Sequence, residues 1–228
     1  MLDVGVVIPV FNGAAFLGEA LDSIASQTRQ PCDVIGVDDG SRDGSLDLLR
    51  AFGARVLRIA HRGQAVAHDR GIAAVGGDLI AFLDQDDRWL PGKLERQVAL
   101  LSAEPDISFV GALSTVFLDP AAKRPSWWKS AWDNGAAEPS LLPSATLYRR
   151  TAFEQAGGFA ETGSVRVSED FAWTARAQDL GLRRALIDEV LVERRIHADN
   201  TSGDPDVRTR EHLAIIRESI TRKRASGG

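Results

Sequence analysis

Short apolar runs alternate with stretches of helical spacing over the first hundred residues. Val4–Val10 is apolar almost throughout, as expected of a strand buried on both faces of a sheet. Apolar residues then recur at helical spacing from Phe16 to Ala25. Three further strand-like runs follow, at residues 34–37, 55–59 and 79–83. Strands that alternate with helices predict an α/β fold with a mostly parallel sheet flanked by helices.

The pattern is weaker after about residue 104. Two strands are predicted at residues 107–111 and 114–118, followed by an irregular segment over 120–143 that is rich in Pro, Ala and Trp. A segment of that length is more often functional or mobile than a plain connection. The remaining predicted elements are a helix from Glu169, short strands over 184–187 and 191–195, and a last helix over 207–221. No repeat or strong linker divides the chain, so we expect one domain over residues 1–228.

Composition and charge narrow the class of protein. The 228 residues are 44% hydrophobic, which is enough to bury a core, and the net charge of −5 does not indicate a nucleic-acid partner. Cys32 is the single cysteine, so no intramolecular disulfide points to an oxidising compartment. The first residues make a poor signal peptide, and no stretch approaches the roughly 20 apolar residues of a membrane span. We therefore expect a cytoplasmic protein.

Acidic clusters follow two of the predicted strands. Asp38 and Asp39 follow the second strand, and Asp84, Asp86 and Asp87 follow the fourth. Ligands of such sheets bind beyond the carboxyl ends of the strands, so we expect these aspartates, at the ends of two neighbouring strands, to converge. Carboxylates this close repel one another unless a cation or strong donors lie nearby, and Mg²⁺ and Mn²⁺ prefer oxygen ligands. An acidic turn that caps the helix near Pro91 is an equally good explanation of the second cluster alone.

The other acidic and histidine candidates carry little signal by themselves. Asp38 and Asp39 could accept hydrogen bonds from a base or a ribose, but a plain turn and helix cap explains an isolated pair better. Glu169 and Asp170 are ordinary residues for a helix start, although a catalytic base would need a carboxylate beside the bond being made. His197 stands alone, and a lone histidine is more often structural than a ligand.

Five motifs in order resemble family 2 glycosyltransferases of the GT-A fold. They are Val6–Asn12 with its continuation through Thr28, Val37–Ser41, Gly76–Asp87, Gly157–Phe159 and Glu169–Asp170. The resemblance covers about residues 4–202, and it is specific because the motifs occur together in the right order. It implies a Rossmann-like nucleotide-sugar-binding half over about residues 1–104 and a smaller mixed acceptor-side half over about 105–205. Residues 206–228 would then form a C-terminal helix or tail.

The resemblance also implies where the nucleotide would bind. Pro9, Phe11 and Asn12 would lie beside the base and ribose. Asp39, with Asp38, would bind the base, which in uridine-diphosphate users is typically uracil.

A second set of implied roles concerns the metal and the chemistry. Asp84 would contact the ribose or the metal, and Asp86 would be the main ligand of Mn²⁺ or Mg²⁺, with Asp87 assisting. Asp170 would be the general base that activates an acceptor hydroxyl, so that the sugar is transferred from a nucleotide sugar, favoured as a UDP-sugar, with inversion. His197 matches a position near which some members contact the metal or the diphosphate.

The chain departs from the family pattern in the third motif. Where members often have Ala-Arg-Asn-X-Gly, this chain has Ala67-His68-Asp69-Arg70-Gly71. An arginine that could neutralise phosphate is thus replaced by His68, which differs greatly in charge and reach. Arg70 or Arg62 could take over the charge. The departure leaves the affinity for the donor and the identity of the donor open.

The acceptor and the partners are less defined. Trp127 and Trp128, like Glu169, fall where the acceptor region should be, and the tryptophans either form a binding surface or pack as a satellite core. The acceptor would be a carbohydrate, lipid-linked or other glycoconjugate. The basic segment over 208–224 either lies on an anionic membrane, at its inner face, or is a solvated tail. The alternative functions are a nucleotidyltransferase and a non-catalytic nucleotide- or sugar-binding module, and the oligomeric state is open.

Overall fold

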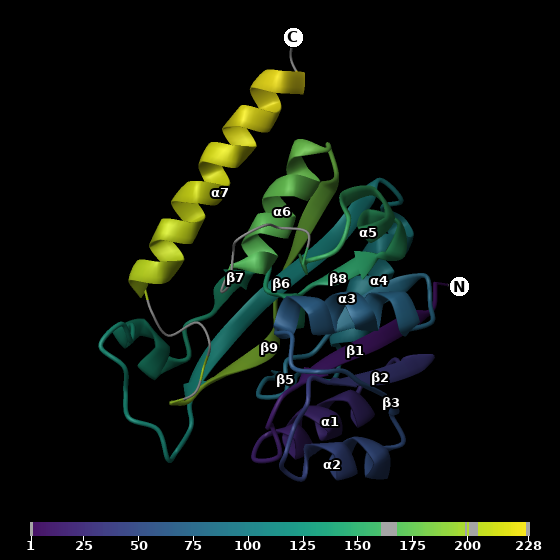
Figure 1. Ribbon diagram of the computed structural model, residues 1–228, viewed down its shortest axis with the longest axis vertical. Helices are drawn as coiled ribbons and strands as arrows, with labels where there is room; N and C mark the ends of the chain where they lie inside the picture. Colours follow the sequence, from purple (N-terminus) through teal and green to yellow (C-terminus); the bar gives the residue numbers. More distant parts are fainter. Residues whose placement is uncertain (1, 161–167, 199, 201–204, 227–228) are drawn as a thin grey trace.

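The computed structural model describes residues 2–160, 168–198, 200 and 205–226 (Figure 1). In this part of the chain nine strands form one mixed sheet in the order β3-β2-β1-β4-β8-β6-β9-β5, with β7 paired to β6. The strands are β1 (Val4–Val10), β2 (Asp33–Asp38), β3 (Arg55–Arg58), β4 (Leu79–Phe82), β5 (Arg88–Trp89), β6 (Ile107–Leu118), β7 (Glu138–Ser140), β8 (Leu147–Arg149) and β9 (Arg183–Ile196).

Helices cover both faces of this sheet. They are α1 (Leu17–Ala25), α2 (Ser45–Phe52), α3 (Gln64–Ala74), α4 (Lys93–Ala103), α5 (Arg150–Ala156), α6 (Glu169–Asp179) and α7 (Pro205–Ser226), with 3-10 turns at Ser130–Asn134 and Pro143–Ala145. None of the described helices is both long enough and apolar enough to cross a membrane. The sequence pattern did not single out α3, α5, β5 or β8, and α7 is longer than the predicted helix over 207–221.

The N-terminal half is the predicted parallel sheet. Strand β1 runs parallel to β2 on one side and to β4 on the other, and every residue of β1 is buried. Alternate residues of β1 serve two cores, because successive side chains of a strand point to opposite faces. Val6 packs in the core beneath α1, α2 and α4, whereas Val7 packs in the core beneath α3, α5 and α6. A strand buried on both sides explains the unbroken apolar run in the sequence.

A single antiparallel strand, β8, joins the second half of the sheet to the first. Strand β8 pairs antiparallel with both β4 and β6, and β9 then pairs parallel with β6. The prediction of two strands over residues 107–118 was wrong, and so was the prediction of two over 184–195. Each pair is one strand. In β9 the chain continues through a bulge, because Ala112 pairs with Ile187 and Leu113 with Val190, which leaves Asp188 and Glu189 outside the ladder, whereas β6 has no inserted residue at this point.

The segment over residues 120–143 is less irregular than predicted. It contains a 3-10 turn and strand β7, which pairs with Ala112–Ser114 of β6. Three half-buried tryptophans pack edge to face in it, with ring centroids 6.2 Å apart for Trp127 and Trp132 and 5.4 Å apart for Trp128 and Trp132. An ion pair between Arg124 and Asp133 closes the segment beside them. The three rings therefore pack on one another, and a role of Trp127 and Trp128 in acceptor binding stays a prediction.

Candidate active site

The loop after β1 is held by hydrogen bonds to the loop after β2. Asn12 has a positive φ of 49°, its backbone N–H donates to Ser41 Oγ (2.9 Å), and its Oδ1 accepts from the backbone N–H of Arg42 (2.9 Å). Phe11 is 40% exposed and stacks on His61 with ring centroids 4.1 Å apart. Pro9 is buried inside β1. Of the three residues expected beside the nucleotide, Phe11 therefore presents an exposed ring. The side chain of Asn12 is used to hold the turn.

The two aspartates after β2 differ in what they contact. Asp38 is fully buried, with Oδ1 accepting from the Ser41 N–H (2.9 Å) and Oδ2 lying 3.1 Å from Arg58 Nε. Asp39 accepts from the backbone N–H groups of Arg62 and Gly63, both at 2.8 Å. Asp38 thus stabilises the turn from inside, whereas Asp39 fixes the loop that carries His61. A base-binding role for either aspartate stays a prediction.

The acidic loop after β4 meets that same loop from the other side. Asp84 Oδ1 accepts from Gln64 Nε2 (2.8 Å), and Gln64 directly follows the two residues bound by Asp39. The expectation of neighbouring strands was wrong, because β1 lies between β2 and β4. The two acidic clusters are nevertheless linked by residues 62–64, because Asp39 binds Arg62 and Gly63 while Asp84 binds Gln64.

Gln85 fastens the acidic loop to the loop after β1. Its Oε1 accepts from the Phe11 N–H (2.9 Å), and its Nε2 donates to the Phe11 carbonyl (3.2 Å). A side chain at Gly13 would overlap the Gln85 amide, so only glycine fits there without a shift. Gln85 therefore connects the acidic loop to the loop after β1.

Asp86 faces His197 across the two halves of the fold. Asp86 Oδ2 lies 2.9 Å from His197 Nε2 and accepts from Asn200 Nδ2 (3.1 Å). Among the described residues there is no cluster of three or more His, Cys, Asp or Glu suited to a metal. Mg²⁺ and Mn²⁺ are commonly held by one or two carboxylates and complete their shell with water and substrate phosphate. The Asp86–His197 pair, with Asp84 close by in the chain, fits that mode of binding.

The crowding of carboxylates in this loop has a clear electrostatic cost. Burial, together with the charges of Asp87 and Asp86, raises the pKa of Asp84 well above its usual value. Burial, and then the charge of Asp86, raises the pKa of Asp87 to about 7. Asp87 is 5% exposed and accepts from the Arg195 N–H (3.2 Å), so it ties the loop to β9, and an assisting role at the metal stays a prediction.

The predicted general base lies in the first turn of α6. Asp170 Oδ1 accepts from the Phe171 N–H (2.8 Å), and burial raises the pKa of Asp170. Burial also raises the pKa of the preceding Glu169 to about 7. The charge of Arg194 lowers the pKa values of Asp84, Asp87 and Asp170 alike. Arg194 therefore lies within electrostatic reach of both the acidic loop and Asp170, a link that the sequence analysis missed.

Arg195 points to the opposite side of β9 from Arg194, as alternation along a strand requires. Its side chain is 5% exposed, and it contacts Glu19 Oε2 (2.7 Å), Asp119 Oδ2 (3.0 Å) and the Asp86 carbonyl (3.2 Å). It thus joins α1, the end of β6 and the acidic loop. The adjacent arginines Arg194 and Arg195 after an apolar run are the signal in the sequence that could have drawn attention to them.

The departure in the third motif has a structural explanation. His68 is buried between the rings of Phe82 and Phe159, with centroids 4.8 and 5.0 Å away, and burial lowers its pKa to about 3. A neutral buried imidazole cannot neutralise a phosphate. Asp69 accepts from the backbone N–H groups of Phe159 (2.7 Å) and Ala160 (2.9 Å), so the third motif supports the Gly-Gly-Phe segment.

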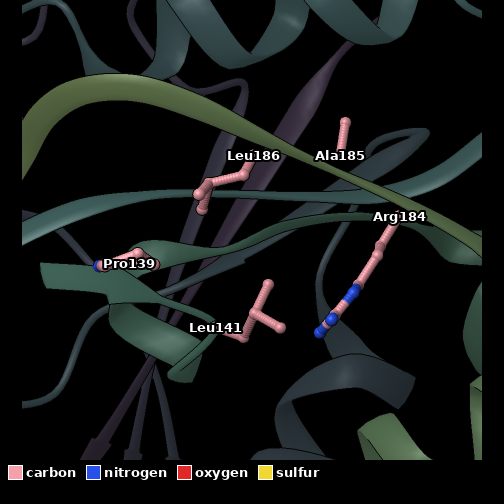
Figure 2. Close-up of a pocket in the computed structure, with 5 residues that line it drawn as sticks. All are labelled: Pro139, Leu141, Arg184, Ala185 and Leu186. Atoms are coloured by element: carbon pink, nitrogen blue, oxygen red, sulfur yellow. The ribbon is translucent and has the colours of Figure 1, made fainter.

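A separate cavity of about 490 Å³ opens beside β7 and β9 (Figure 2). It is lined by Pro139, Leu141, Arg184, Ala185 and Leu186. None of these residues belongs to the acidic loop or to the first turn of α6. The predicted acceptor-side residues Trp127 and Trp128 do not line it either.

Comparison with known proteins identifies the family of this chain. The chain belongs to glycosyl transferase family 2, whose sequence profile matches residues 5–161. An uncharacterised glycosyltransferase of Nostoc is 31% identical over 121 residues, which are 50% of this chain and 38% of that protein. The putative teichuronic acid biosynthesis glycosyltransferase TuaG of Bacillus subtilis is 32% identical over 104 residues, 43% of this chain and 41% of that protein. The chain thus spans about two fifths of the length of these curated relatives.

Solved structures confirm the expected GT-A fold. Staphylococcus aureus TarS in complex with UDP-GlcNAc superposes with a TM-score of 0.70 at 16% identity, covering 96% of this chain and 66% of that one. Glucosyl-3-phosphoglycerate synthase of Mycobacterium tuberculosis, in complex with Mn²⁺, UDP and phosphoglyceric acid, has a TM-score of 0.66 at 21% identity. It covers 96% of this chain and 78% of that one.

Proposed function

We propose that this chain transfers a sugar from a nucleoside-diphosphate sugar, a UDP-sugar by preference, to an acceptor hydroxyl with inversion of the anomeric centre. The observation that carries the proposal is the 2.9 Å approach of Asp86 and His197, which come from opposite halves of the fold. Residues 1–104 would bind the donor and residues 105–205 the acceptor.

The donor would bind where the loops after β1, β2 and β3 meet. Phe11 offers an exposed ring stacked on His61, and Asp39 holds the backbone of that loop. Aromatic rings of this kind bind bases by stacking. Two structural neighbours are complexes with UDP-GlcNAc and with UDP, which supports a uridine nucleotide here.

Asp86 and His197, with Asp84, would hold Mn²⁺ or Mg²⁺. The donor set fits because these ions take carboxylate oxygens and leave positions for phosphate. When bound, the ion would supply a positive charge that stabilises the leaving diphosphate. The Mn²⁺ in the structure of the mycobacterial neighbour supports this assignment.

Asp170 would accept the proton of the acceptor hydroxyl as that oxygen attacks the anomeric carbon. Attack from the side opposite the leaving diphosphate inverts the centre, so no covalent enzyme intermediate forms. Burial raises the pKa of Asp170, and the charge of Arg194 lowers it. Arg194 therefore favours the ionised form that a base needs at neutral pH. The acceptor would be a carbohydrate, lipid-linked or other glycoconjugate, with Glu169, Trp127 and Trp128 on its side of the site.

The test compares three variants in UDP binding and in sugar transfer. Asp86→Ala should lose Mn²⁺-dependent UDP binding, measured by calorimetry, because it removes the main ligand. Asp170→Asn should bind UDP normally but turn over a UDP-sugar panel about a hundred- to ten-thousand-fold more slowly, the usual contribution of a general base. Asp47→Ala, at an exposed position on α2, is the matched control and should change neither.

Unchanged metal-dependent binding in Asp86→Ala would rule out the metal assignment. Unchanged turnover in Asp170→Asn would rule out the base. A wild-type chain that binds no nucleoside diphosphate with either ion would refute the proposed donor class.

A further inference from the structure

One face of α7 holds this helix against α6 (Figure 1). His212 packs on Phe171 with ring centroids 4.3 Å apart, and Ile215 is 2% exposed. Ser219 Oγ (2.7 Å) and Arg222 Nε (2.9 Å) both donate to Asp179 at the end of α6. The inward residues 212, 215, 219 and 222 recur at helical spacing, so they form one stripe along the helix.

A second stripe on α7 is apolar and faces outward. Leu213, Ile216 and Ile220 are 50%, 46% and 46% exposed. Each follows an inward residue by one position, which rotates it by about 100° around the helix axis. Single exposed aliphatic residues are ordinary, but three on one stripe form a continuous patch, and such patches mark interaction sites.

The charges on α7 are divided between its two sides. Arg217 and Arg224 are exposed, seven residues apart, and lie beside the aliphatic stripe on the side turned away from α6. Glu211 and Glu218 lie about half a turn from the stripe, on the other side of the helix. The outward half of α7 therefore combines large aliphatic side chains with arginines.

We propose that this outward face of α7 binds an anionic membrane surface, with Leu213, Ile216 and Ile220 inserted among the lipids. A helix with an aliphatic stripe and arginines beside it has the chemistry of a helix that lies in a lipid interface. A second copy of the face would offer these arginines no carboxylates, because Glu211 and Glu218 lie on the other side of the helix, and a nucleic acid would not need the aliphatic stripe. The helix is also too polar to span a membrane.

This binding does not depend on the proposed transfer reaction. It would matter for that reaction, because α7 packs on α6, and α6 begins with Glu169 and Asp170. A protein that lies on the membrane through α7 would hold the acceptor side of its site close to lipid-linked acceptors. Binding to lipid and transfer of sugar can therefore fail separately in experiments.

The experiment measures co-sedimentation of the full chain with phosphatidylcholine vesicles, with and without phosphatidylglycerol. We expect binding only when phosphatidylglycerol is present. Leu213→Ser with Ile220→Ser should weaken it about ten-fold or more, because two half-exposed aliphatic side chains no longer leave water. Arg217→Gln with Arg224→Gln should weaken it about 25-fold, or about five-fold for each arginine near an anionic surface.

Two controls match these changes elsewhere. Leu186→Ser removes an exposed aliphatic side chain on β9, and Arg50→Gln removes an exposed arginine on α2; neither should alter binding. Circular dichroism checks that every variant is folded. Absence of binding to anionic vesicles, or equal binding by all variants, would overturn the proposal. So would a dimer in sedimentation velocity that the two serine substitutions abolish, because the patch would then bind a second copy.

Discussion

Arg195→Met should destabilise the fold strongly, whereas Arg88→Met should not. Both arginines contact Glu19 Oε2, and both lie over the Phe117 ring, with guanidinium carbons 4.7 and 4.1 Å from its centroid. Their side chains differ in exposure: 5% for Arg195 and 34% for Arg88. Each also pairs with one further carboxylate, Asp119 for Arg195 (3.0 Å) and Glu193 for Arg88 (3.1 Å), so the main difference between them is burial.

The expected loss in free energy of unfolding follows from the partners that each substitution leaves unpaired. Loss of the Arg195 guanidinium removes the donor to Asp119 and to the Asp86 carbonyl and takes one of two partners from Glu19. Removing one member of a buried ion pair costs about 3–5 kcal/mol, and we expect about 3 because Glu19 is half exposed and keeps Arg88. Removing the more exposed Arg88 should cost at most about 1 kcal/mol. Methionine fills similar space in both cases.

Urea unfolding, followed by circular dichroism, gives both free energies of unfolding if the m-values agree. Arg195→Met should also melt about 6–12 °C lower, at about 2–4 °C per kcal/mol for a chain of this size. A loss below about 1 kcal/mol in Arg195→Met, or equal losses in the two variants, would refute the assignment of Arg195 as the buried connector of the two halves.

Two further predictions concern titration. Arg194→Gln should move the acidic limb of the pH profile of kcat/KM for sugar transfer to higher pH, because loss of the positive charge raises the pKa of Asp170; an unmoved limb would contradict the placement of Arg194. His68→Leu should unfold with equal or higher free energy at neutral pH, because both ring nitrogens of His68 are buried without hydrogen-bond partners. The folded-state pKa of about 3 lies below the unfolded value near 6.5, so wild type should lose about 1.4 kcal/mol per pH unit relative to His68→Leu as pH falls below about 6.5. Parallel stability curves for the two proteins over that range would disprove this account of His68.

The first half of the fold was predictable because its strands are buried on both faces. In β1 and β4 every residue is buried, so apolar runs mark the strands directly. In β9 the charged pair Asp188–Glu189 interrupts the run, and the pattern breaks there although the strand continues through a bulge. The parallel pairing of β6 with β9 joins segments far apart in the sequence, which no local pattern reports.

In the candidate site, too, some residues were visible in the sequence pattern and others were not. The aspartates at the strand ends could be singled out from the sequence because a parallel sheet places its ligand beyond those ends. His197 meets Asp86 across 111 residues, so only the family resemblance pointed to it. His61, which contacts Asp39, lies in the loop before α3, and Gln64, which contacts Asp84, is the first residue of that helix; neither stands in a distinctive sequence pattern. Such contacts depend on the path of the backbone and are not visible in the sequence.

The connection through Gln85 makes positions 13 and 85 interdependent. A larger residue at position 13 would displace the Gln85 amide, and a smaller residue at position 85 would remove it; either change gives up the two hydrogen bonds to Phe11. Substitution at either position alone should therefore be harmful, and the two should covary among homologous chains. The same connection ties the loop that holds Asp86 to the backbone of Phe11, so under the proposed function the ion and the base would bind cooperatively.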